Sequence, residues 1–134
     1  MPTPRAGAPN LELQKARILA ITSEVQTWLG LDWLHIVHLF NENDNDEDEM
    51  ARAVGKWQYR YAEITWNLYT VMAAEDLTLI KTAIHECVHI LLAPIDKHIP
   101  LSKPHVTEAN EFAVESVAQA IVRALRTPPP DALG

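Results

Sequence analysis

The sequence contains a single cysteine, Cys87, among 134 residues. No disulfide can form within this chain, and with 48% hydrophobic residues it is large enough to build one core without such links. Residues 1–9 lack the apolar segment of a signal peptide, and no apolar run is judged long enough to cross a bilayer. We therefore expect a soluble, cytoplasmic domain without membrane contact.

Basic residues are also scarce, with 11 Lys and Arg against 18 Asp and Glu, so the net charge is −7. Residues 41–49 hold six of the acidic side chains and are predicted to form a solvated acidic loop. Without that loop the domain is nearly neutral, which excludes a nucleic-acid partner. A calcium loop is excluded as well, because Glu49 stands where such a loop needs Gly and Gly55 where it needs a bidentate Glu.

The most informative stretch is an H-E-x-x-H motif, His85-Glu86-Cys87-Val88-His89, inside a long apolar helical run. Residues four apart on a helix stand one above the other, so His85 and His89 converge on one point, as zinc ligands do. Glu86 lies about 100° around the helix, where its carboxylate can reach a metal-bound water without being a ligand. The alternative is a pair of core histidines bonded to the backbone, with Glu86 turned outward.

The segments before this motif supply the scaffold. We expect a helix from Asn10, its cap, to Leu29, ended by Gly30, and a strand at residues 33–40. His35 and His38 then point to opposite faces of that strand and cannot form a joint metal pair. Residues 50–56 are assigned to a helical turn or a loop. Residues 57–71 alternate as a half-buried strand, the candidate sheet edge for binding an extended peptide.

The segments after the motif should supply the third ligand. The metal helix is predicted at residues 75–93, ended by Pro94, and residues 94–106 are predicted to be a loop. No Gly or His follows the motif at the spacing of the extended zinc motif. A last helix is expected at residues 107–126, capped by Thr107. Glu111 and Glu115 share the upper end of its apolar face, Glu108 lies one turn earlier, and all three remain candidate ligands.

The motif followed by Asn110-Glu111 and then Glu115 resembles the gluzincin pattern of the thermolysin-like metallopeptidases, and also small H-E-x-x-H proteins of phages and bacteria. The resemblance covers residues 57–126 at most. It implies Glu111 as the third ligand, Glu115 as the residue that orients His85, and Asn110 as a residue facing the substrate. No residue matches the family's oxyanion-stabilising position, which stays open among Tyr59, Tyr61, Tyr69, His98 and His105.

Together these features predict an α+β, minimal zincin-like domain over residues 10–126, between disordered tails at 1–9 and 127–134. It would have an N-terminal helix, a small, mainly antiparallel sheet, the buried metal helix and a C-terminal ligand helix. The expected function is zinc-dependent hydrolysis of a peptide or protein substrate, with one zinc ion and Glu86 as general base. The alternative is a non-catalytic interaction protein, a phage or regulatory component, that zinc stabilises.

Overall fold

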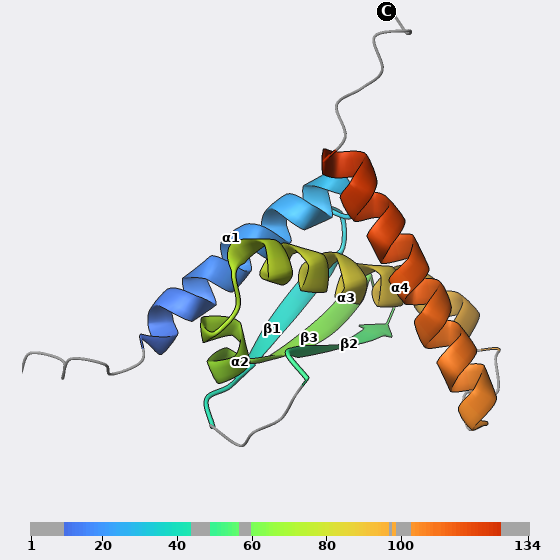
Figure 1. Ribbon diagram of the computed structural model, residues 1–134, viewed down its shortest axis with the longest axis horizontal. Coiled ribbons are helices and arrows are strands. Elements are labelled where there is room, and N and C mark those ends of the chain that lie inside the picture. The colour runs from blue at the N-terminus through green and yellow to red at the C-terminus, as the bar shows by residue number, and fades with distance from the viewer. Residues whose placement is uncertain (1–9, 44–48, 57–59, 97, 99–102, 127–134) are drawn as a thin grey trace, which may run out of the picture.

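A computed structural model describes residues 10–43, 49–56, 60–96, 98 and 103–126 (Figure 1). The predicted tails, most of the acidic loop and Tyr59 lie outside the described residues. The described part is α+β, as the sequence predicts. Its elements, in chain order, are α1 (Leu11–Trp28), β1 (His35–Asn41), β2 (Ala51–Lys56), β3 (Tyr61–Asn67), α2 (Leu68–Met72), α3 (Asp76–Asp96) and α4 (Pro104–Arg126).

The sheet has three strands in the order β1-β3-β2, with β3 in the middle. β1 is parallel to β3 and β2 is antiparallel to it, so the sheet is mixed and the prediction of a mainly antiparallel sheet is wrong. The parallel pair arises because the chain crosses from β1 to the far edge, forms β2, and returns through the middle. This order leaves β1 and β2 as the two edges of the described sheet.

The region predicted as a helical turn or loop at residues 50–56 is strand β2, which corrects that assignment. Ala51, Ala53 and Gly55 alternate with more exposed neighbours, and this period of two outweighs the helix propensity of alanine. The next strand is shorter than predicted, because β3 ends at Asn67 and Leu68 begins α2. Since β3 is central, the expectation that residues 57–71 form the peptide-binding edge is also wrong.

The start of α3 is fixed by an arginine from α1. The Arg17 guanidinium donates hydrogen bonds to the backbone carbonyls of Val71, in the last turn of α2, and Ala74, just after that helix, and pairs with Asp76 at 2.7 Å. Asp76 lies in the first turn of α3, where a negative charge favours the helix dipole. Arg17 therefore links α1, the end of α2 and the beginning of the helix that contains the H-E-x-x-H motif.

Helix α3 extends to Asp96 and includes Pro94, so the prediction that Pro94 ends this helix is wrong. Proline in the last turn removes only the bond that its N–H would make to the Ile90 carbonyl, which a helix end tolerates. That carbonyl lies against β2, where a Cβ added at Gly55 would be 3.5 Å from it and 2.9 Å from the Ala93 Cβ. Glycine thus allows β2 to lie directly against α3.

By length and composition, α3 could cross a membrane over Asp76–Pro94, which corrects the expectation that no run is long enough. The helix is apolar enough because apolar residues occupy nearly every side of it. In the fold, however, α3 packs against β2, α1 and α4, and its apolar residues join the core that β3 and α1 also line (Figure 1). The core helix of a soluble protein can have the same length and composition, so these two properties of α3 are weak evidence for a membrane span.

Helix α4 begins at Pro104, three residues before the predicted cap Thr107. Proline suits this position because its fixed φ matches the helix and its missing N–H would have no partner in the first turn. Val114, Ala118 and Val122 form its buried face, and α4 packs mainly against α3 (Figure 1). This packing places the N-terminal half of α4, which contains Glu111 and Glu115, beside the two histidines of α3.

Candidate metal centre

His85 and His89 lie one turn apart on α3, with ring centroids 4.9 Å apart and ring planes inclined by 70°. Both side chains are about one-fifth exposed, whereas their neighbours Ile84 and Val88 are in the core. The helical spacing therefore brings the two imidazoles to the edge of the buried region, on the side where α4 crosses α3.

Glu111 of α4 brings a carboxylate to both imidazoles. Its Oε1 lies 3.2 Å from His89 Nε2 and its Oε2 lies 3.7 Å from His85 Nε2. One ligand atom from each of the three residues can be chosen so that all lie within 4.8 Å of one another. Ligands about 2.0–2.1 Å from a tetrahedral ion are about 3.3 Å apart, so these separations suit a shared metal ion. His85, His89 and Glu111 are thus a group that could bind a metal.

Glu115 approaches the other nitrogen of His85. Its Oε2 lies 2.8 Å from His85 Nδ1, and its Oε1 accepts a hydrogen bond from Gln119. A hydrogen bond at Nδ1 directs the Nε2 lone pair of His85 toward Glu111, the arrangement that metal-ligating histidines usually show. The bonds from Gln119 and His85 outweigh the effect of partial burial and lower the pKa of Glu115.

The structure separates the three acidic residues that the sequence left as candidate ligands. Glu111 lies in the cluster, Glu115 bonds to the far side of His85, and Glu108 is exposed and outside the group. The side chains of Glu111 and Glu115 are 53% and 54% exposed, so they are better solvated than their place on an apolar face suggested. Solvent and the histidines together accommodate their charges.

Glu86 is the buried acid of the site, at 6% exposure. Burial, reinforced by the negative charges of Glu49 and Glu111, raises the pKa of Glu86 to about 8. A hydrogen bond from the Ala53 backbone N–H and the charge of Arg52 act in the opposite direction. Glu86 therefore faces the edge strand β2 rather than turning outward, and the alternative of an outward-pointing residue is wrong.

His85, His89 and Glu111, the candidate metal-ligating group, border a hollow of about 320 Å³. Its walls come from the three candidate ligands and Glu86, from Thr107 and Asn110 of α4, and from Glu49, Ala51, Arg52 and Ala53 in and before β2. A second hollow of about 340 Å³ adjoins it on the other side of His85 and Glu86. Asn110, which the resemblance places near the substrate, is thus part of the wall.

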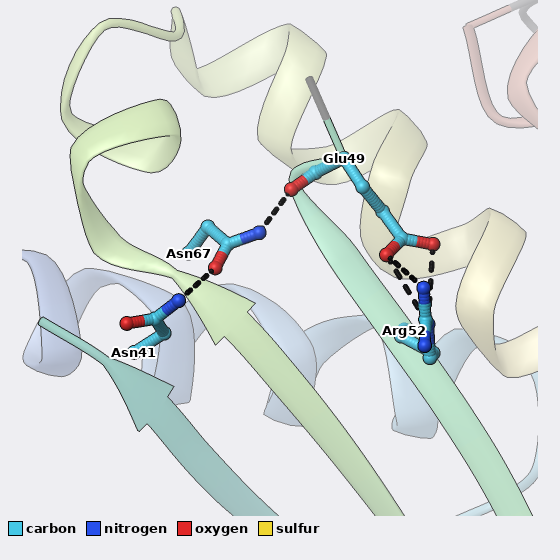
Figure 2. A network of polar contacts seen from close by, with 4 residues as sticks. All are labelled: Asn41, Glu49, Arg52 and Asn67. Atoms are coloured by element: carbon cyan, nitrogen blue, oxygen red, sulfur yellow. Dashed lines mark hydrogen bonds and ion pairs between the residues drawn. The ribbon is translucent and has the colours of Figure 1, made fainter. Parts of the chain in front are cut away.

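Sequence reasoning missed Glu49 and Arg52. Arg52 Nη2 and Nε lie 2.8 and 3.1 Å from Glu49 Oε2, and the Glu49 backbone carbonyl accepts a hydrogen bond from Asn67 Nδ2 (Figure 2). Asn67 Oδ1 in turn accepts from Asn41 Nδ2 at 2.9 Å. The opposite charges at positions i and i+3 are a signal in the sequence, but the sequence predicts an acidic loop at residue 49 and a helical turn or a loop at residue 52.

None of the predicted oxyanion donors lines the hollow of the metal-ligating group within the described residues. The Tyr61 hydroxyl donates to Glu63 at 2.6 Å, and Tyr69 is in α2. His35 and His38 also remain apart from the site, since His38 Nδ1 accepts a hydrogen bond from the Trp66 indole. The positively charged group that the structure does place in the wall is Arg52.

Comparison with known proteins adds no relative, because no family model, curated protein or solved structure matches this chain. The case for a function therefore depends on the residues of the site.

Proposed function

We propose that the protein is a zinc-dependent metallopeptidase in which His85, His89 and Glu111 hold one zinc ion. The observation that supports this most strongly is the Glu111 carboxylate, which reaches both Nε2 atoms of an H-E-x-x-H pair while Glu115 bonds to His85 Nδ1. Two imidazoles and one carboxylate are a common catalytic zinc set, which leaves the fourth position for water or substrate. In this arrangement the domain would be a minimal, gluzincin-like zincin.

A bound zinc ion would lower the pKa of a water molecule and polarise the scissile carbonyl. Glu86 would accept a proton from the attacking water and transfer it to the leaving amine nitrogen as the C–N bond breaks. The Ala53 N–H bond to the Glu86 carboxylate holds this side chain toward β2. A dication nearby would also favour the ionised form of Glu86, which a general base requires.

The free edge of β2 is the proposed site for an extended peptide. The Met50 carbonyl accepts a hydrogen bond from the Asn67 N–H, so the backbone groups of alternate residues, Arg52 and Val54 among them, face β3. The backbone groups of Ala51, Ala53 and Gly55 then point away from β3, toward the side of the metal-ligating group. A substrate strand could pair with the backbone groups of Ala51 and Gly55 and with the Ala53 carbonyl, while the Ala53 N–H stays bonded to Glu86.

The experiment compares the zinc content and peptide cleavage of the wild type with those of Glu86→Gln, using a library of peptides from a digested proteome. The wild type should bind one zinc ion per chain and cleave peptides, whereas Glu86→Gln should keep the zinc and lose cleavage. Glu108→Gln is the matched control, because it makes the same chemical change at an exposed residue outside the site. Zinc without cleavage by the wild type would support a non-catalytic, zinc-stabilised protein instead.

A further inference from the structure

We propose that Arg52 is the oxyanion-binding residue of this site, the group that binds the negatively charged oxygen formed from the scissile carbonyl. This inference rests on the proposed function and names a role that the sequence left open. It starts from position: Arg52 lies on β2, an edge strand of the described sheet, and is one of the residues that line the same hollow as His85, His89 and Glu111. Among the described residues that line this hollow it is the only lysine or arginine.

The size of the hollow limits how far Arg52 can be from the reacting atoms. Its volume is about 320 Å³, so Arg52 and the three candidate ligands border one small space. The Arg52 side chain is 73% exposed, so a group that enters the hollow can reach the guanidinium without breaking core packing.

The orientation of the guanidinium is fixed by the network in Figure 2. Glu49 accepts hydrogen bonds from Nε and Nη2 of Arg52, and its own backbone carbonyl is bonded by Asn67. The plane of the guanidinium is therefore tied to the ends of β3 and β1. Groups that stabilise developing charge act best when they are positioned before the reaction, because no reorganisation is then required.

The charges of the hollow also favour this role. Its described walls contain three acidic residues, Glu49, Glu86 and Glu111, of which Glu111 is a proposed metal ligand and Glu86 the proposed proton carrier. Attack by water moves the electron pair of the carbonyl bond onto oxygen, and that charge needs a donor that stays protonated. Arginine is such a donor at every pH at which the protein is folded, and it offers five N–H groups.

The first test uses anion binding, so no substrate is needed. Cobalt-substituted protein is titrated with inorganic phosphate, a tetrahedral oxyanion, and binding is followed by the visible spectrum of the metal. Arg52→Ala should weaken phosphate binding at least 10-fold while cobalt affinity and the circular dichroism spectrum stay unchanged. Lys56→Ala is the matched control, because Lys56 is an exposed cation on the same face of β2 that does not line the hollow. It should bind phosphate as the wild type does.

Two results would overturn the inference: phosphate affinity that is equal in Arg52→Ala and wild type, or cobalt-loaded wild type that does not bind phosphate. Failure of the wild type to bind cobalt would instead remove the metal centre itself, and with it both proposals. For any peptide that the wild type cleaves, Arg52→Ala should lower kcat more than it raises KM. A higher KM confined to peptides with a carboxylate near the scissile bond would show that Arg52 binds a substrate carboxylate, which contradicts the oxyanion role.

Discussion

Glu111 is the residue whose substitution tests the metal centre most directly. The two atoms of its carboxylate face different histidines, at 3.2 Å from His89 Nε2 and 3.7 Å from His85 Nε2. Glu111→Gln keeps the size of the side chain but replaces the charged carboxylate, a common zinc ligand, with a neutral amide, which binds zinc weakly. We expect this variant to fold and to lose most of its zinc affinity.

The magnitude follows from linkage between binding and folding. Zinc at 100 times its Kd stabilises a folded protein by about 2.7 kcal/mol. With an unfolding entropy of about 2.1 cal/mol/K per residue, a chain of 134 residues gains about 10 °C in Tm. If Glu111→Gln weakens zinc binding 100-fold, the same concentration equals Kd and the gain falls to about 0.4 kcal/mol, or about 1.5 °C.

The assay is thermal unfolding of chelator-treated protein with and without zinc, followed by circular dichroism. Comparing each variant with and without metal removes any effect of the substitution on the metal-free protein. Glu108→Gln is the control, since Glu108 lies one turn earlier on α4 and outside the cluster. A zinc-induced shift that is as large in Glu111→Gln as in the wild type would refute Glu111 as a ligand.

Three further substitutions test the support of the site by Glu115, the packing of β2 on α3, and the pH dependence of stability. Glu115→Ala should reduce zinc affinity 10- to 100-fold by removing the partner of His85 Nδ1, as competition with a chromophoric chelator would measure. Gly55→Ala should destabilise the fold by about 1–3 kcal/mol in urea, because its Cβ would lie 2.9 Å from the Ala93 Cβ; an unchanged midpoint would refute close packing of β2 on α3. Burial lowers the pKa of His38, so the unfolded chain takes up a proton more readily as the pH falls below about 6.5. His38→Gln should therefore lose less stability than the wild type between pH 7.5 and pH 5.

The part of the site that the sequence predicted is the part determined by one helix. His85, Glu86 and His89 have fixed relative positions as soon as the helix forms, because they depend on the helical repeat alone. The apolar run around them predicted burial of that helix, and Ile84 and Val88 are indeed in the core. The α+β class could be predicted for the same reason, since long periodic segments give the clearest patterns.

The sheet was harder to predict because its pairing depends on distant parts of the chain. Apart from Val54, residues 51–56 have small or charged side chains rather than the β-branched residues typical of strands, and they become a strand because β3 pairs with them. Gly55 was needed for contact with α3, which no local pattern reveals. Because residues 50–56 were predicted to be a helical turn or a loop and Glu49 part of the acidic loop, neither Arg52 nor Glu49 could be placed at the site.

The same reasoning explains why the sequence limits the third ligand to three candidate glutamates but does not choose among them. Helical spacing put Glu108, Glu111 and Glu115 on neighbouring parts of one helix, but the choice among them depends on how α4 crosses α3. Val114, Ala118 and Val122 determine that crossing, because they are the buried residues of α4. Their position in the core places Glu111 opposite the two Nε2 atoms.

Because of this dependence, a metal ion bound at the proposed site would have a structural consequence as well as a chemical one. Among the described elements α4 packs mainly against α3, and the two helices also share the polar contacts of Glu111 and Glu115 with the histidines. Both carboxylates are about half exposed, so these contacts hold the two helices weakly, since solvent screens such pairs. A metal ion shared by His85, His89 and Glu111 would replace those weak contacts with direct bonds between α3 and α4. The positions of the proposed ligands therefore depend on the packing of α4 against α3. A substitution that disrupts this packing at Val114 or Ala118 should lower the metal affinity without changing a proposed ligand.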